Sequence, residues 1–339
     1  MYTENPGLSE HTRREYASSA ERLVQTAESE AESKRFEFIS SHTREELKFE
    51  LRDMLGFPLN SKPCSDLNFI REHISRDDLC DIYRVSLSPL PDFRTFGMLF
   101  IPHVYGGKGR LVIALHGVLG TPELMYGMHG RNGYGNIIRR MLEHGLCVYA
   151  PQLMIWNCGQ SPAKPCYETK YAREELDRRL KNVGGSMTAL EVFSTLSAIS
   201  PLCELPEIDG EKIGLFGMSF GAYLGLFITA LDERISAAYL SSCFNDREKY
   251  TFPDWQYKNY LNTFCDAEVA YLCAPRRLFV EVGERDDFFS VSGARREASR
   301  ALEYYKTAGA EENFIFKTWN GAHIVSPEND GIDFLLSEI

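Results

Sequence analysis

The chain lacks the sequence features of several protein classes. No run of Lys and Arg is longer than a pair, and 48 acidic residues outnumber 37 basic ones, which gives a formal net charge of −11. Nucleic acids and anionic membrane surfaces both select for basic patches. The composition therefore argues against both as partners. Internal repeats and low-complexity tracts are also missing, which excludes solenoid and fibrous architectures.

Cysteine motifs and a secretion signal are missing as well. The nine cysteines are odd in number, and none of them forms a C-x-x-C pair or lies at metal-ligand spacing from histidines. The N-terminus, residues 1–14, is polar and contains no apolar signal core. These features predict reduced thiols in a cytoplasmic protein without a structural metal.

A long stretch without a charged residue runs from Ile213 to Leu231. An uncharged run of this length is also typical of a membrane span. Glycines interrupt it at four positions and charged residues flank it closely, so we reject the span. A strand, a turn and a helix at the centre of an α/β domain would be apolar on both faces in the same way.

A G-x-S-x-G motif lies inside this stretch, at Gly217-Met218-Ser219-Phe220-Gly221. The pattern places a serine on a sharp turn between a strand and a helix, where the glycines let the helix pack closely against the strand. The pentapeptide alone is weak evidence. Its context strengthens it, because the apolar strand 213–216 precedes it and the small-residue helix 222–231 follows it. We therefore predict Ser219 as the nucleophile of a serine hydrolase.

The partners of such a serine follow it in the chain, with an acid after a late strand and a histidine after the last one. His323 is the only histidine downstream of Ser219, so we predict it as the general base. For the acid we choose Asp286, which would orient the imidazole and stabilise its protonated form. Asp287 is the alternative, and Glu281 on the preceding strand is a more distant one.

The oxyanion that forms on a carbonyl under attack needs two hydrogen-bond donors. One is expected to be the backbone amide of Phe220, directly after the nucleophile. The other is expected in the loop 116–121, where the amide of Val118 is the predicted donor. His116, at the start of that loop, is interpreted as a brace that holds the loop by hydrogen bonding.

The predicted sheet has eight strands and follows a helical N-terminal part. Residues 1–60 are expected to form a helical appendage, with one long helix over 10–38 and a second that begins at the capping box Thr43/Glu46 and stops at Gly56. Residues 61–80 are expected as a polar connector. The appendage is interpreted as a packing element on the catalytic domain, with a role as a lid or in forming a homo-oligomer as the alternative.

Residues 81–339 are predicted to form one α/β domain, a mostly parallel sheet with helices on both faces. The first two strands lie close together, as in an antiparallel hairpin, and later strands alternate with helices. Ligands are expected outside the carboxyl ends of the parallel strands. The eight strands are expected at 81–88, 94–101, 111–115, 146–150, 213–216, 235–241, 277–282 and 313–318.

A segment rich in aromatic residues, 242–276, lies between the sixth and seventh predicted strands. Its aromatic density exceeds the 12% average of the chain. Such an insertion is expected to form a cap, whose rings would make an apolar wall beside a polar catalytic cluster. We predict that at least one ring contacts the substrate, and we single out Tyr250, Trp255 and Tyr257. Ordinary core packing is the alternative for each of them.

From about residue 80 to its end, the chain resembles the α/β-hydrolase superfamily, and within it the dienelactone hydrolase and acetyl xylan esterase-like branch related to prolyl oligopeptidases. The resemblance implies hydrolysis of a small-molecule carboxylic ester through a serine acyl-enzyme, without metal or organic cofactor. The chain departs from the family pattern at three places. It has Val118 where many esterases have glycine, Pro151-Gln152 where an aspartate is common, and Arg277 where a proline is frequent. The resemblance rests on the elbow 217–221 with Tyr223, on 230–235, on Ala274-Pro275-Arg276, on Gly283 with Asp286, and on Gly321 with His323.

We therefore expect a serine esterase that acts on small or aromatic esters. Cleavage of a peptide, lactone or carbon-carbon bond by the same three residues is the first alternative. A catalytically silent ligand-binding protein on the same fold is the second, and the apparently complete set of serine, acid and histidine argues against it.

Overall fold

The computed structural model describes residues 6–103, 107–118, 120–128, 134–154, 173–250 and 252–339. Within them a single sheet of nine strands has the order β1-β2-β3-β5-β4-β6-β7-β8-β9. The pairs β1–β2, β2–β3 and β3–β5 are antiparallel, and all other pairs of neighbouring strands are parallel. The strands are β1 (Ile70–Arg76), β2 (Cys80–Leu90), β3 (Phe93–Pro102), β4 (Gly109–Leu115), β5 (Cys147–Pro151), β6 (Ile208–Met218), β7 (Ile235–Ser241), β8 (Arg277–Gly283) and β9 (Phe314–Trp319).

All eight predicted strands are present, and the ends of most differ from the prediction by one or two residues. The ninth, β1, corrects the expectation of a connector over 61–80. It is an edge strand paired only with β2, and nearly all of its residues are exposed. A strand with little buried surface needs no apolar alternation, so its sequence, IREHISR, has the pattern of a polar linker.

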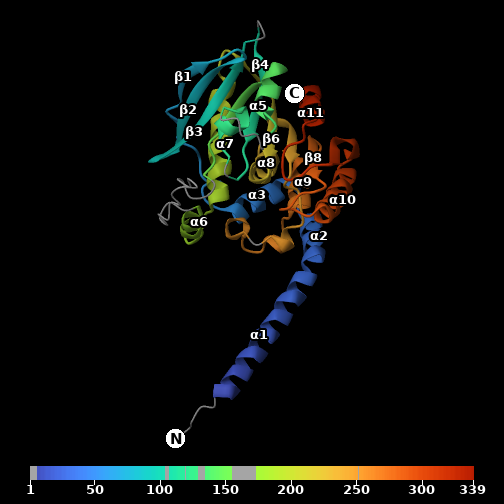
Figure 1. The fold of residues 1–339 in the computed structure, drawn as a ribbon. Coiled ribbons are helices and arrows are strands. Elements are labelled where there is room, and N and C mark those ends of the chain that lie inside the picture. Colours follow the sequence, from blue (N-terminus) through green and yellow to red (C-terminus); the bar gives the residue numbers. More distant parts are fainter. Residues whose placement is uncertain (1–5, 104–106, 119, 129–133, 155–172, 251) are drawn as a thin grey trace.

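Helices cover both faces of the sheet (Figure 1). In β4, Leu111, Ile113 and Leu115 join one apolar cluster, and Val112 and Ala114 join the other. This alternation follows from the two-residue period of a strand that is buried on both sides. The helices of the α/β domain are α4 (Pro122–Tyr126), α5 (Ile137–Glu143), α6 (Arg173–Lys181), α7 (Met187–Cys203), α8 (Phe220–Leu231), α9 (Asp266–Cys273), α10 (Val291–Thr307) and α11 (Asp330–Glu338).

The N-terminal part has three helices, α1 (Pro6–Ser29), α2 (Ala31–Ser41) and α3 (Arg44–Leu55). The single helix expected over 10–38 is therefore divided at Glu30. No residue of α1 is buried, and the helix projects from the body of the protein (Figure 1). Burial begins at Ala31 and continues through α3, whose Leu47, Leu51 and Leu55 join the main core.

The expected ends of α3 are confirmed. The hydroxyl of Thr43 accepts from the amide of Glu46 at 3.3 Å, and the Glu46 carboxylate accepts from the amide of Thr43 at 2.8 Å. At the other end Gly56 has a φ of +83° and donates its N–H to the carbonyl of Arg52. These local bonds satisfy backbone groups that the helix itself leaves free.

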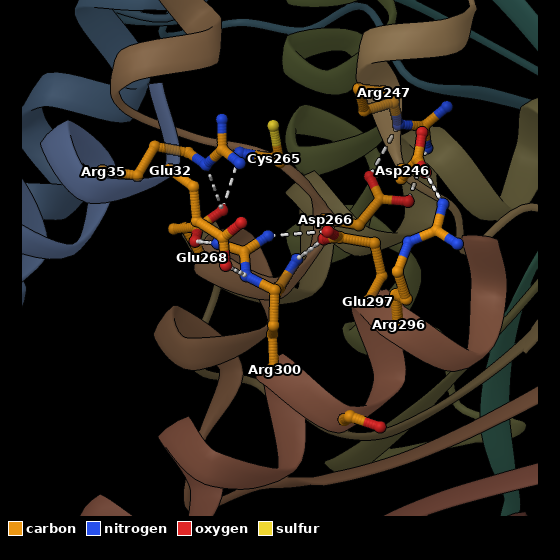
Figure 2. A network of polar contacts seen from close by, with 12 residues as sticks. Glu32, Arg35, Asp246, Arg247, Cys265, Asp266, Glu268, Arg296, Glu297 and Arg300 are labelled. Atoms are coloured by element: carbon orange, nitrogen blue, oxygen red, sulfur yellow. Dashed lines mark hydrogen bonds and ion pairs between the residues drawn. The ribbon is translucent and has the colours of Figure 1, made fainter. Parts of the chain in front are cut away.

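A network of charged side chains attaches α2 to the catalytic domain (Figure 2). Arg35 of α2 is buried, its Nε lies 3.7 Å from the Glu268 carboxylate of α9, and it donates to the carbonyl of Leu261. Glu268 also accepts from Arg300 and, at 3.1 Å, from the hydroxyl of Tyr304. Arg35 thus balances part of the negative charge that Glu268 brings into the interior.

The same network continues toward the segment after β7 (Figure 2). Asp266, also on α9, accepts from Arg247 at 2.7 Å and from the amide of Asn245 at 2.8 Å. Glu297 of α10 accepts from the Ala267 amide at 3.1 Å, and burial, with Glu268 close by, raises its pKa. These contacts link three arginines and three carboxylates, Arg35, Arg247, Arg300, Asp266, Glu268 and Glu297. Pairs with Glu32, Asp246 and Arg296 extend the network (Figure 2).

We predict that Arg35→Ala lowers the free energy of unfolding by about 3 kcal/mol, because it removes one cation from a buried pair and leaves Glu268 less compensated. The neighbouring variant Lys34→Ala is the matched control. It removes an exposed pair with Glu30 at 2.9 Å and should cost less than about 1 kcal/mol. Urea unfolding followed by circular dichroism measures both, and equal effects would contradict the anchoring role of Arg35.

Candidate active site

Ser219 occupies a strained turn between β6 and α8. Its backbone has φ 55° and ψ −119°, a conformation that is costly for a residue with a side chain. The surrounding glycines explain how the turn fits: a Cβ on Gly221 would lie 2.1 Å from the carbonyl oxygen of Leu115, and one on Gly217 would lie 2.5 Å from the carbonyl oxygen of Gly221. The amide of Ser219 donates to the carbonyl of Ser241 at 2.8 Å. This packing holds the serine at the carboxyl end of the sheet.

Three predicted residues come together at this turn. The Nε2 of His323 lies 2.8 Å from the Oγ of Ser219, and its Nδ1 lies 2.8 Å from the Oδ2 of Asp286. The Asp286 side chain is fully buried, and its Oδ1 accepts from the amides of Phe288 and Phe289 at 2.8 and 2.9 Å. With an ionised Asp286, Nδ1 carries the ring proton and Nε2 is free to accept the serine proton.

The two alternative acids lie elsewhere. Asp287 is exposed, whereas Glu281 is buried on β8. One oxygen of Glu281 accepts from the hydroxyls of Tyr239 and Ser241 at 2.6 and 2.8 Å and from the amide of Ser326 at 3.0 Å. Burial raises the pKa of Glu281. These bonds join β7 and β8 to the loop that carries His323, so Glu281 stabilises the position of that loop.

The segments that carry the two predicted oxyanion donors both lie next to Ser219. Phe220 is the first residue of α8, where backbone amides have no partner within the helix and the helix dipole favours negative charge. The loop that carries Val118 passes close on the other side, since a Cβ on Gly117 would lie 3.1 Å from the Cβ of Ser219. The structure thus brings both segments to Ser219.

His116 holds the Val118 loop from within the protein. It is completely buried, its Nδ1 lies 3.0 Å from the carbonyl oxygen of Gly117, and its Nε2 accepts from the amide of Leu153 at 3.0 Å. Because an amide can only donate, Nε2 is unprotonated and Nδ1 carries the proton. Burial lowers the pKa of His116 to about 4, so the ring is neutral near pH 7. This arrangement matches the bracing role expected for His116.

Three buried charged residues beside Phe220, Arg173, Asp254 and Glu191, form an ion triad that the sequence pattern does not predict. Arg173 is buried, and its guanidinium bonds to Asp254 and Glu191, each at 2.6 Å, and to the carbonyl of Met154 at 2.7 Å. It lies over the ring of Phe220, 4.5 Å from the ring centre. Its helix, REELDRRLK, has the composition of a solvated surface, so the sequence carries no signal that would single out Arg173.

The same triad is linked to the other oxyanion segment. Glu191 accepts from the amide of Met154 at 2.6 Å, and the preceding residue, Leu153, donates to His116. His116 in turn bonds to Gly117, directly before Val118. A continuous path of hydrogen bonds therefore runs from the triad to the Val118 loop.

The three aromatic residues predicted to contact substrate have packing partners close to the site. Trp255 is buried and stacks on Tyr223, with ring centres 4.3 Å apart. The hydroxyl of Tyr257 bonds to that of Tyr223 at 2.8 Å, and the hydroxyl of Tyr250 accepts from the amide of Ser290 at 2.9 Å. In this arrangement these rings support α8 and the loop of the acid, which is the packing role considered as their alternative.

Exposed apolar side chains lie instead beside His323. The ring of Phe288 is centred 4.7 Å from the imidazole and is 65% exposed. Ile324, the residue after His323, is 41% exposed. The buried ring of Phe289 is centred 5.6 Å from the ring of His323. The pattern DDFF does not single out Phe288, because it does not reveal which phenylalanine is exposed.

In the described part of the chain, no group of three His, Cys, Asp or Glu side chains is placed to hold a metal ion, and no helix is long and apolar enough to cross a bilayer. The seven cysteines in this part are free, and burial raises the pKa of Cys243, near the site, to about 11. A surface hollow of about 530 Å³, lined by Lys108, Cys203 and residues 209–211, lies at the opposite end of β4 and β6.

We predict that His116 makes the stability of the protein depend on pH. The unfolded histidine takes up its proton near pH 6.5 and the folded one near pH 4, so the unfolded state binds more protons between these values. Stability should therefore fall as pH falls through this window, by about 3 kcal/mol from this group.

Urea unfolding of the wild type and of His116→Asn at pH 7.5, 6.5, 5 and 4 isolates this contribution, because other titrating groups are common to both. The free energy of unfolding of the variant should change less with pH by that amount. Parallel pH profiles for the two proteins would refute the assignment of a neutral, buried His116.

Comparison with known proteins gives a family match over part of the chain. A family model described as the C-terminal part of BAAT and acyl-CoA thioester hydrolases matches residues 188–254. This segment contains α7, β6, the turn at Ser219, α8 and β7. No curated protein matches the chain.

Several solved esterase structures resemble the chain in fold. A glucuronoyl esterase from Solibacter usitatus aligns with a TM-score of 0.64 at 14% identity, over 88% of this chain and 91% of its own. A candidate acetyl xylan esterase from Bacteroides fragilis gives 0.63 at 15% identity, over 81% and 74%. A methylesterase gives 0.58 at 20% identity, over 92% of this chain and 64% of its own. At such identities the likeness establishes the shared fold.

Proposed function

Because the chain has the α/β-hydrolase fold, we propose that it is a serine esterase that uses Ser219, His323 and Asp286 as its catalytic triad. The observation that carries this proposal is the pair of 2.8 Å contacts that link the serine to the histidine and the histidine to the aspartate. The strained backbone at Ser219 supports the same assignment, because such strain is typical of functional sites.

In the proposed reaction, Oγ of Ser219 attacks the ester carbonyl while Nε2 of His323 takes its proton. The carbonyl oxygen becomes an anion that accepts hydrogen bonds from the amides of Phe220 and Val118. Collapse of this intermediate breaks the bond to the alcohol, which leaves with the proton from Nε2. A water molecule then attacks the acyl-enzyme with the help of the same histidine, and the acid and Ser219 are released.

Asp286 has a positioning and electrostatic role in this scheme. It keeps the proton of His323 on Nδ1 and stabilises the positive charge that the ring gains at each proton transfer. The two backbone amides that bind its other oxygen hold the carboxylate in place. The chemistry requires neither a metal nor an organic cofactor.

We propose small or aromatic neutral esters as substrates. The net charge of −11 repels anionic substrates at long range. The structural neighbours described above are esterases of uronic, acetyl and methyl ester types by name, which favours oxygen esters. Thioesters are the second candidate, because the family match over 188–254 is to acyl-CoA thioester hydrolases.

We predict that Ser219→Ala and His323→Ala each lower kcat by on the order of a million-fold, because the members of a triad act as one unit. Asp286→Asn should cost about ten thousand-fold. Asp287→Asn is the matched control and should retain at least half of the wild-type kcat. Steady-state hydrolysis of p-nitrophenyl acetate measures all four.

The assignment of the nucleophile can be checked without a known substrate. A fluorophosphonate should label the wild type on Ser219, as mapped by mass spectrometry, and should leave Ser219→Ala unlabelled. More than a tenth of wild-type activity in Ser219→Ala or His323→Ala would refute the triad. A larger loss for Asp287→Asn than for Asp286→Asn would move the acid by one position.

We also predict that kcat/KM falls as the acyl chain of a p-nitrophenyl ester lengthens from acetyl to palmitoyl, because the described surface offers a compact apolar edge at His323. A maximum at twelve or more carbons would indicate a lipase-like groove instead. Acetyl-CoA, compared with phenyl acetate, separates the two candidate functions. The many phosphate charges of CoA disfavour binding to an acidic protein, so a higher kcat/KM for acetyl-CoA would favour the thioesterase.

A further inference from the structure

We infer that Phe288 is a specificity-determining residue that binds the alcohol part of the ester and selects for aromatic or bulky apolar alcohols. This inference rests on the proposed function, because it needs His323 to act on a leaving group. It differs from the sequence-based expectation, which placed the substrate-binding rings in the segment 242–276. The argument uses the position of Phe288, its exposure, and the direction of proton transfer.

The position of Phe288 is set by the triad itself. Its amide donates to Oδ1 of Asp286 at 2.8 Å, while Oδ2 of the same carboxylate contacts Nδ1 of His323 at 2.8 Å. The ring of Phe288 then lies 4.7 Å from the imidazole, with 49° between the ring planes. The amide bond fixes the backbone of Phe288 to the catalytic acid, and the ring contact places its side chain beside the base.

The exposure of this ring is unusual for so constrained a side chain. Phe288 is 65% exposed although its amide is bonded to Asp286 and its ring contacts His323. Its neighbour Phe289, bonded to the same carboxylate, is buried and stacks on Trp255. Core packing therefore accounts for Phe289 and leaves most of the Phe288 ring in contact with solvent. An apolar surface kept open beside a catalytic base favours a ligand that covers it.

The geometry of the reaction identifies which part of the ester would lie there. Nε2 of His323 must give its proton to the leaving oxygen, so the alcohol lies against the imidazole. The carbonyl oxygen points the other way, toward the amides of Phe220 and Val118. The ring of Phe288 lies beside the imidazole of His323, so it forms the exposed apolar edge that the alcohol meets. An aryl alcohol would gain an aromatic contact there that methanol cannot make.

A series of acetate esters tests this directly. Methyl, benzyl and 2-naphthyl acetate share one acyl group, so they form the same acetyl-enzyme and differ only in the alcohol. In Phe288→Ala we expect kcat/KM for the benzyl and naphthyl esters to fall about ten-fold relative to wild type, and that for methyl acetate to change less than two-fold. Phe288→Tyr, which keeps the ring, should restore most of the loss.

The kinetic step that Phe288→Ala changes also tests whether the ring binds the alcohol. Where breakdown of the acetyl-enzyme limits turnover, kcat should be the same in Phe288→Ala and wild type, because the alcohol has already left. Phe36→Ala is the matched control, since Phe36 is 66% exposed on α2 and should leave every rate unchanged. Thermal unfolding of each variant checks that the fold is intact.

Two results would overturn the inference while leaving the esterase function in place. One is an equal fractional loss for all three acetates in Phe288→Ala, which would mean that the ring only positions Asp286 and His323. The other is a loss that follows acyl length in a series of methyl esters. If the wild type hydrolyses none of the esters although a fluorophosphonate labels Ser219, the esterase proposal fails and this inference fails with it.

Discussion

The close contact between the start of α8 and the carboxyl ends of β4 and β6 is the constraint on which the site depends. A Cβ on Gly221 would lie 2.1 Å from the carbonyl oxygen of Leu115, so only glycine allows the helix to approach this far. That approach forces Ser219 into a strained conformation and points the free amides at the start of α8 toward the same space. One packing contact thereby orients both the hydroxyl and a predicted oxyanion donor.

The order of the parallel strands brings the other groups to this point. β6, β7, β8 and β9 are neighbours in the sheet, so the loops after them lie side by side at one edge. Asp286 follows β8 and His323 follows β9, and each needs only a short loop to reach Ser219. Glu281 strengthens this arrangement, because its carboxylate bonds to Ser241 at the end of β7 and to the loop after His323.

Buried charges and aromatic rings surround the site and hold it in shape. Arg173, with its two carboxylate partners, lies over Phe220, and Arg247 lies 4.7 Å from the ring centres of Tyr223 and Trp255. Through Asp266 and α9, Arg247 belongs to the network that also anchors α2 (Figure 2). The N-terminal helices α2 and α3 are therefore packed into the catalytic domain, whereas α1 projects from it.

Local sequence was sufficient for features that depend on neighbouring residues. The central strands are continuous apolar runs, α3 carries its own capping signals, and G-x-S-x-G with a single downstream histidine pointed to Ser219 and His323. Only the tertiary structure brought Asp286 rather than Asp287 to the imidazole, made a strand of Ile70–Arg76, buried Arg173 and left Phe288 exposed. These outcomes depend on partners far away in the chain. A residue's burial and partners are set by what packs against it, and sequence patterns record only the local part of that information.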